Sequence, residues 1–262
     1  MTPNASTATT SALVFEGCGC RAAFYAGVAA ELDAAGMRFP VAAGASSGSL
    51  CAAAVAAGHA ANLPALWRDL AGRSVLSLQR AWHNRSIFDM SSIVRNGIVG
   101  LLGDGDMRNA PGEAIAAVTV MPRFTTEFLS SRTEANMINV LLGSCFIPGI
   151  YGRWITHQAA TGRRRVLFDG GMRNNLPVEA ATNAGATNII CVVSRPHPFA
   201  NRHPFHRRWQ PAPPPGAAAR IHIIHPLAPL AVQSWDLDRT RVLAAIDAGR
   251  IAAARFLDLS AL

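Results

Sequence analysis

Two short apolar runs, each followed by a glycine-containing turn and a helical pattern, constrain the fold of this 262-residue chain most strongly. The first run is "ALVFEG" at 12–17, and the segment 21–35 after it repeats apolar residues every three or four positions before Gly36. The second run is "FPVAAGAS" at 39–46, and residues 47–57 after it are all small or apolar, as in a helix packed closely on a sheet. Repeated strand–turn–helix units require parallel strands with crossover connections.

The rest of the chain continues this alternation. We expect strands at 114–121, 123–131, 164–171, 187–194 and 220–226, and helices at 63–72, 91–102, 133–146 with Thr133 as N-cap, 177–184 and 237–257. These elements predict an α/β fold of three layers, with a central, mainly parallel sheet and helices on both faces.

The chain is predicted to form one domain. Residues 1–11 are expected to be a flexible leader, and 12–262 the single domain. Within it, about 62–110 is a candidate cap or acyl-chain wall, and 195–219 is a loop rich in Pro, His and Arg. The longest apolar stretches, such as "CAAAVAA", are too short to span a membrane, and the start of the chain lacks a secretory signal pattern. We therefore expect a cytoplasmic protein, with peripheral membrane association as the alternative, and make no prediction of its oligomeric state.

The charge composition gives little support to a nucleic-acid partner. The formal net charge is +8, and all 24 basic residues are arginine, which indicates compositional bias rather than selection for a partner. The one basic cluster, "NRHPFHRRWQ" at 201–210, lies in a Pro-rich stretch and resembles no nucleic-acid-binding module. It is either a solvated loop or, if it binds anything, a site for anionic lipid headgroups.

The cysteines predict neither a disulfide framework nor a metal site. There are five, an odd number, scattered through apolar segments. Cys18 and Cys20 form a C-x-C pair, but no second pair or nearby histidine completes a set of four zinc ligands.

The first glycine-rich turn, "EGCGCRAAF", has two interpretations. Read as G-x-G-x-x-A, it fits a relaxed dinucleotide-binding fingerprint, but Asp33 is poorly placed to be the ribose-binding acid. Alternatively, its backbone N–H groups form an oxyanion hole for a serine that attacks an ester carbonyl. The next strand ends at "GASSGSL", 44–50, where Gly44 and Gly48 flank Ser46 as in a nucleophile's turn.

A nucleophilic serine needs a base, and the sequence offers two kinds. Asp169 stands at the end of its own expected strand, before Gly170 and Gly171. A histidine from the C-terminal half, such as His197, His222 or His225, would instead complete a Ser–Asp–His triad. Ser46 follows only about one strand, which is earlier than in the α/β-hydrolases.

Four segments in order, "LVFEGCGCRAAFYAGV", "GASSGSL", "SCFIPGIYG" and "DGGMRNNLPV", resemble the patatin-like phospholipases. The resemblance implies a dyad without histidine, in which Ser46 attacks the acyl carbonyl and Asp169 is the base. It implies an acyl-enzyme intermediate and release of a fatty acid from a lipid or membrane-surface substrate, with no metal or organic cofactor. Acyl transfer to another acceptor, or a non-catalytic or partner-activated lipid-binding protein, are the alternatives.

The resemblance also assigns supporting residues. Gly17, Cys18, Gly19 and Cys20 would carry the oxyanion donors, and Arg21 would match the family arginine, with either a structural or a headgroup-binding role. Two positions depart from the family pattern, since Cys18 and Ala22 stand where glycine is usual. If position 18 needs a positive φ, the cysteine would strain or displace the oxyanion turn. A lesser alternative is that Cys18 or Cys20 accepts the acyl group.

Overall fold

The computed structural model describes residues 10–73, 95, 97, 100–103, 105, 107–150, 154–158, 162, 164–196 and 219–260. Most of the expected 1–11 leader, of the 195–219 loop and of the middle of the 62–110 segment lies outside these residues, as does His197. The strands are β1 (Ser11–Phe15), β2 (Val41–Ala45), β3 (Glu113–Met121), β4 (Thr125–Ser130), β5 (Ile155–Gln158), β6 (Arg164–Asp169), β7 (Asn188–Val192) and β8 (Arg220–Ile224). The α-helices with complete bounds are α1 (Ala23–Ala34), α2 (Ser47–Ala56), α3 (Leu63–Leu70), α6 (Met137–Ser144), α7 (Val178–Asn183) and α8 (Arg239–Ser260), and the 3-10 turns are η1 (Gly19–Ala22), η2 (Ala60–Asn62) and η3 (Gly170–Met172).

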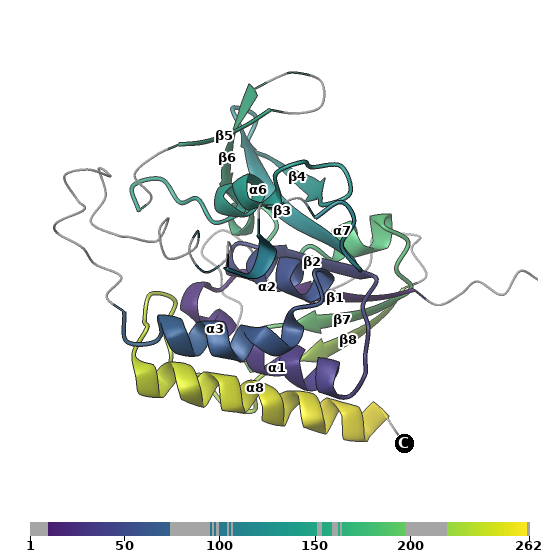
Figure 1. Ribbon diagram of the computed structural model, residues 1–262, viewed down its shortest axis with the longest axis vertical. Helices are drawn as coiled ribbons and strands as arrows, with labels where there is room; N and C mark the ends of the chain where they lie inside the picture. The colour runs from purple at the N-terminus through teal and green to yellow at the C-terminus, as the bar shows by residue number, and fades with distance from the viewer. Residues whose placement is uncertain are drawn as a thin grey trace, which may run out of the picture.

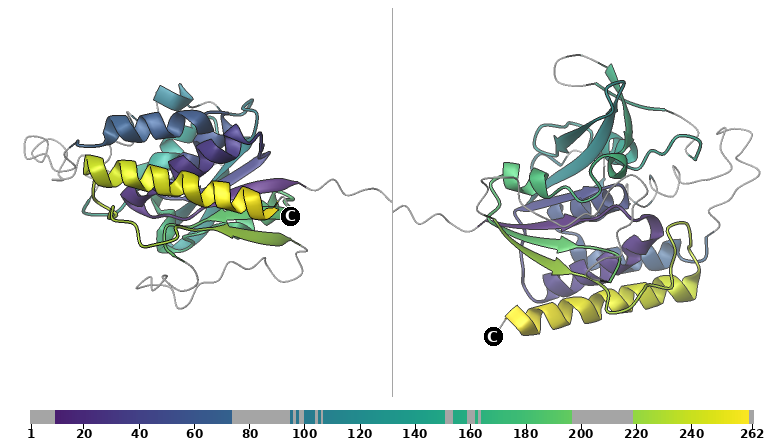
Figure 2. Two further views of the ribbon diagram at one scale, coloured as in Figure 1. Left: turned by 90° about the horizontal axis from the view of Figure 1, so that it is seen from below. Right: turned by 180° about the vertical axis from the view of Figure 1, so that it is seen from behind.

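All eight strands form one mixed sheet in the order β5-β6-β3-β2-β1-β7-β8, with β4 also paired to β3. Strands β3, β2, β1, β7 and β8 are parallel, which confirms the expected crossover topology. Strands β4 and β6 run antiparallel to β3, and β5 runs antiparallel to β6. The antiparallel strands lie at the opposite end of the molecule from α8 (Figure 2).

The sheet is covered on both faces, as the alternation of side chains in β1 shows. Leu13 and Phe15 belong to a core shared with α1, α2, α3, α6 and α8, whereas Ala12 and Val14 belong to a second core shared with α7. Because successive side chains of a strand point to opposite faces, two cores on one strand mean three layers. The α/β/α prediction is therefore confirmed (Figure 1).

Two expectations for single elements are corrected. The helix expected at 133–146 begins only at Met137, and its N-cap is Asn136, whose Oδ1 accepts the N–H of Asn139 at 3.0 Å. Thr133 is not the cap, because it lies in the preceding turn, where its hydroxyl donates to the Ser130 carbonyl at 3.1 Å. Strand β5 was not expected from the sequence. No helix in the described ranges combines the length and apolar character needed to cross a lipid bilayer.

Helices α1 and α8 approach so closely that each needs a glycine at the contact. A Cβ on Gly27 of α1 would overlap the carbonyl oxygen of Ile246, and a Cβ on Gly249 of α8 would overlap that of Phe24. The two helices therefore pack backbone to backbone, and α8 closes the core over α1 (Figure 1).

We expect Gly27→Ala to lower the free energy of unfolding by about 2–3 kcal/mol, because the added methyl group forces the two helices apart. This corresponds to a Tm lower by about 5–10 °C, measurable by circular dichroism. Gly100→Ala is the control, because Gly100 is also helical but has open space around its Cβ position. Equal stability of the two variants would contradict this account of the α1–α8 contact.

Candidate active site

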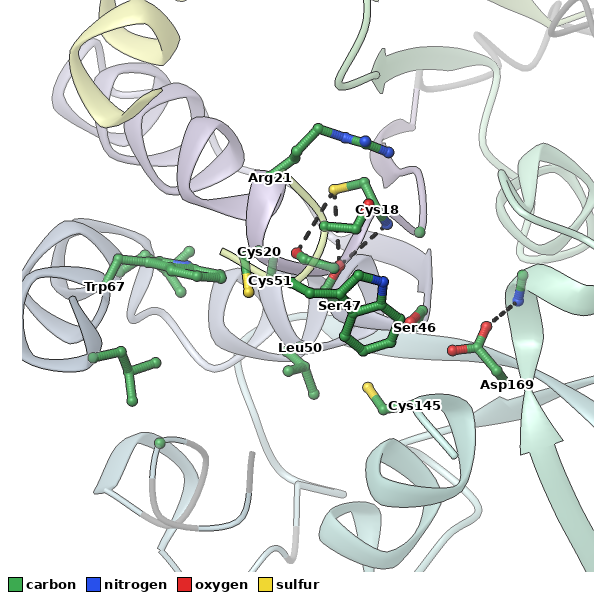
Figure 3. A pocket seen from close by; sticks show the side chains of 18 of the residues that line it. Cys18, Cys20, Arg21, Ser46, Ser47, Leu50, Cys51, Trp67, Cys145 and Asp169 are labelled. Carbon is green, nitrogen blue, oxygen red and sulfur yellow. Dashed lines mark hydrogen bonds between the residues drawn. The ribbon is translucent and has the colours of Figure 1, made fainter. Parts of the chain in front are cut away.

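The register of the sheet brings together the ends of β1, β2 and β6, because β2 and β6 both pair with β3. Phe15 pairs with Gly44 across β1 and β2, Ala45 pairs with Ala117 across β2 and β3, and Val118 pairs with Asp169 across β3 and β6. The glycine turn after β1, Ser46 after β2 and Asp169 at the end of β6 therefore lie in one row across the sheet. Figure 3 shows the Asp169 carboxyl pointing toward Ser46.

Ser46 occupies a strained turn between β2 and α2. Its φ is 51° and its ψ is −132°, a conformation that non-glycine residues rarely adopt and that costs about 1–3 kcal/mol. The glycines on either side permit this turn, since a Cβ on Gly44 would overlap the backbone of Gly48, and one on Gly48 would lie 2.6 Å from the Glu16 carbonyl oxygen. The Ser46 N–H donates to the Ser144 hydroxyl at 3.0 Å. The backbone of Ser46 is thus held at the start of α2, whose N-terminal dipole favours negative charge.

Asp169 is a buried carboxyl that accepts a backbone hydrogen bond. It is 5% exposed, and its Oδ1 accepts the Gly171 N–H at 2.7 Å. Burial raises the pKa of Asp169 from 3.8 to about 6, against the opposing effect of hydrogen bonds from Ser46 and Gly171. A carboxyl with this pKa is ionised at neutral pH and still able to accept a proton, as a general base requires. Gly170 is needed here, because a Cβ on it would overlap the Ala117 carbonyl oxygen.

The histidine and dinucleotide alternatives receive no support from the described residues. Neither His222, whose ring contacts Phe256 edge to face, nor His225, whose Nδ1 lies 3.0 Å from the Pro226 oxygen, lines the cavity that contains Ser46. Asp33 lies in the last turn of α1 and pairs with Arg38 at 2.9 Å, away from the glycine turn.

The backbone donors of the glycine turn are unequally available. The Gly17 N–H donates to the Asn175 carbonyl and the Cys20 N–H to the Ser234 carbonyl, both at 2.9 Å. The Cys18 N–H donates to the Ser47 hydroxyl at 3.2 Å, and the Gly19 N–H has no acceptor within the described parts of the chain. Cys18 and Gly19 are therefore the donors that a developing oxyanion can reach with the least rearrangement.

A cavity of about 470 Å³ opens beside Ser46 and Asp169. It is mainly apolar, and its wall comes largely from α2, α3 and the described residues near 100. These apolar residues are Leu50, Leu63, Leu66, Trp67, Leu70, Leu101, Leu102 and Ile147. Several of them belong to the 62–110 segment that the sequence suggested as an acyl-chain wall. Among the described residues no group of three or more His, Cys, Asp or Glu could hold a metal ion.

A sequence model of the patatin-like phospholipase family matches residues 13–182, more than half of the chain and both Ser46 and Asp169. The chain belongs to the patatin-like phospholipase family. The crystal structure of VipD from Legionella pneumophila has a similar fold, with a TM-score of 0.58 at 12% sequence identity, over 95% of this chain and 67% of that one. No curated protein sequence matches the chain.

Neither of the two departures from the patatin-like pattern falls at a position with a positive φ. Cys18 has a φ of −153°, so this position does not need glycine, whereas Gly19 has a φ of +64° and does. Ala22 has ordinary right-handed helical geometry at the start of α1. The cysteine therefore does not require a left-handed backbone conformation in the turn.

The thiols near the patatin-like site are poor acyl acceptors. Burial raises the pKa of Cys18 to about 11 and that of Cys20 to about 12, and it raises the pKa of Cys145 well above its usual range. Since the thiolate is the nucleophile, these side chains are unreactive near neutral pH. They serve as small apolar groups in the cavity wall (Figure 3).

Three residues around the turn had no assigned function from sequence patterns, namely Glu16, Tyr25 and Ser194. Glu16 is 4% exposed and hydrogen-bonds to both of the others. Arg21 donates from Nε to the Ser194 hydroxyl at 3.2 Å, which is a structural contact although not to a loop carbonyl. The one available signal was an acidic residue ending an apolar strand, which predicts a buried charge with dedicated partners.

Proposed function

We propose that the chain is a lipid acyl hydrolase of the phospholipase A or lysophospholipase type, which cleaves carboxylic esters with a Ser46–Asp169 dyad. The observation that carries this proposal is the strained Ser46 facing the buried Asp169 carboxyl at the wall of an apolar cavity. Family membership supports lipid acyl hydrolysis in general, and the dyad and substrate class are the finer parts of the proposal.

The reaction divides into two transfers of the acyl group. In the first, Ser46 Oγ attacks the ester carbonyl carbon while its proton passes to Asp169, and the oxygen that becomes negative receives N–H bonds from Cys18 and Gly19. Collapse of the tetrahedral intermediate breaks the ester C–O bond, and Asp169 returns the proton to the leaving alcohol. In the second, Asp169 takes a proton from water, the resulting attack releases the fatty acid, and Ser46 regains its proton.

The apolar cavity supports long acyl chains, because their burial there removes hydrocarbon from water at about 0.8 kcal/mol per methylene group. Phospholipids, lysophospholipids and neutral glycerides all satisfy this requirement. Arg21 lies at the wall of the same cavity, where a headgroup phosphate would find a positive charge.

We expect the wild-type chain to react with a fluorophosphonate probe at Ser46 and to release fatty acid from mixed vesicles of phospholipid, lysophospholipid and glyceride. Mass spectrometry of the labelled peptide identifies the serine, and product analysis separates fatty acid release from acyl transfer to an alcohol. Heat-unfolded protein is the control for labelling. A folded chain that is neither labelled nor active on any of the three lipids would contradict the proposed function.

A further inference from the structure

Glu16 is a buried carboxylate that the proposed reaction does not use. It follows β1 directly and precedes the glycine turn. Its Oε2 accepts the backbone N–H and the hydroxyl of Ser194, both at 3.0 Å, and the hydroxyl of Tyr25 at 3.4 Å. Its Oε1 accepts from Asn175 Nδ2 at 3.3 Å. Four donors from three separate parts of the chain thus converge on one buried carboxylate, which offsets the cost of removing it from water.

The positive charge nearest to this carboxylate in the hydrogen-bond network is Arg21. Its Nε donates to the Ser194 hydroxyl, and that hydroxyl donates in turn to Glu16. The two charges are therefore joined through a single hydroxyl group. This arrangement fixes the first residues of the helical segment after the turn relative to the end of β7.

Asn175 connects Glu16 to the catalytic dyad. Its carbonyl accepts the Gly17 N–H at 2.9 Å, so it holds the start of the glycine turn. Its Oδ1 packs against two glycines. A Cβ added to Gly17 would lie 2.6 Å from this oxygen, and a Cβ added to Gly171 would lie 2.5 Å from it. Gly171 is also the N–H donor to Asp169. A shift of Asn175 would therefore disturb both the backbone bond that holds Gly17 and the close packing beside Gly171 in the loop that holds the base.

We propose that Glu16 is a positioning residue, which holds the glycine turn, Arg21 and the Asp169 loop in the arrangement required for the transition state. This inference rests on the proposed function, because it concerns the same oxyanion turn and base. Loss of the carboxylate leaves the donors of Ser194 and Tyr25 with one weaker acceptor and introduces an N–H₂ group among donors. The turn then relaxes away from Ser46, and the N–H groups of Cys18 and Gly19 lose their alignment with the oxyanion.

The test compares Glu16→Gln with Glu113→Gln, which makes the same change at another carboxyl. Glu113 is the first residue of β3, accepts a hydrogen bond from the Ser130 hydroxyl and does not line the cavity. For a soluble p-nitrophenyl ester we expect kcat of Glu16→Gln to fall between about tenfold and a hundredfold. We expect its KM to stay within about twofold, and Glu113→Gln to keep wild-type values. Rates are normalised to the fraction of chains that a fluorophosphonate labels to completion.

A second measurement separates positioning from a loss of folded protein. An alkyl boronic acid adds to Ser46 Oγ, whose proton passes to Asp169, and the tetrahedral adduct places a negative oxygen at the oxyanion donors. We expect Glu16→Gln to bind this inhibitor more weakly by the same factor as the fall in kcat, while its affinity for the product fatty acid is unchanged. Partial unfolding would instead weaken both affinities by the same factor, because only the folded fraction binds.

Two milder variants test the positioning role of Glu16 if Glu16→Gln does not fold. Ser194→Ala removes the hydroxyl donor, and Tyr25→Phe removes the phenol donor, while both keep the carboxylate. Each is expected to weaken boronic acid binding but not fatty acid binding. If boronic acid affinity stays within twofold of an active wild type in all folded variants, the role of Glu16 is refuted and the proposed function stands. A wild-type chain that is neither labelled nor hydrolytic refutes both.

Discussion

Ser46→Ala is expected to reduce fatty acid release by at least about a thousandfold, because Ser46 is the cavity-lining residue toward which the Asp169 carboxyl points. The neighbouring thiols do not replace it, since the pKa of Cys18 is about 11 and that of Cys145 is higher than usual. The fold should be retained, because alanine keeps the same backbone preferences at a φ of 51° and removes only the hydroxyl. Release from vesicles and circular dichroism are measured on the same samples.

Ser131→Ala is the matched control for this experiment. Ser131 is fully buried, whereas Ser46 is partly exposed. The Ser131 hydroxyl accepts the Ala114 N–H, and Ser131 stands at the far end of β3 from Asp169. We expect this variant to lose some stability and to keep its rate per folded molecule. If folded Ser46→Ala releases fatty acid at the wild-type rate, the nucleophile is another residue and the dyad is wrong.

The elbow around Ser46 could be predicted from local sequence because its requirement is local. Gly44 and Gly48 are needed where the α2 backbone meets the ends of β1 and β2, because a Cβ at either position would overlap neighbouring backbone. The sequence shows this requirement directly as one glycine two residues before the serine and one two residues after it. The parallel pairing of β1 with β2 follows from the helix between them. Together these two facts are enough to predict that Ser46 lies beside the glycine turn.

The placement of Asp169 needed more than local sequence. Its strand was expected, but β6 is antiparallel to β3 and reaches Val118 from the opposite direction to β2. A short strand such as β5, with four residues and no strong alternation, gives little signal for such a hairpin. Asp169 therefore faces Ser46 through pairing between strands that are distant in sequence.

The Glu16 network could not be predicted for a similar reason. Its donors come from Tyr25, Asn175 and Ser194, and only the folded sheet brings β1 and β7 side by side. A single sequence shows one acidic residue at a strand end and no pattern that names its partners. Residues that position others are thus harder to find than the residues that react.

Asp169→Asn is expected to lower activity strongly and to raise stability at the same time. The variant keeps an oxygen that can accept the Gly171 N–H, but it cannot take the proton of Ser46. We expect release to fall by at least about a hundredfold, as for the loss of a general base. In the wild type, kcat/KM should fall below about pH 6, where the Asp169 carboxyl becomes protonated, by up to tenfold per pH unit.

The gain in stability follows from the direction of the pKa shift. Because the pKa of Asp169 is about 6 in the folded chain and 3.8 for an aspartate in water, the ionised group opposes folding above pH 6 by about 3 kcal/mol. This destabilisation disappears as the pH falls from 6 toward 4, because in that range the folded chain binds a proton at Asp169 and the unfolded chain does not. Asp169→Asn should therefore have a higher Tm than the wild type at pH 8, and the difference should shrink at pH 4.5. An equal Tm at pH 8 would mean that the carboxyl is better solvated than its burial implies. It would contradict the claim that burial raises the pKa of Asp169 to a value suited to a general base.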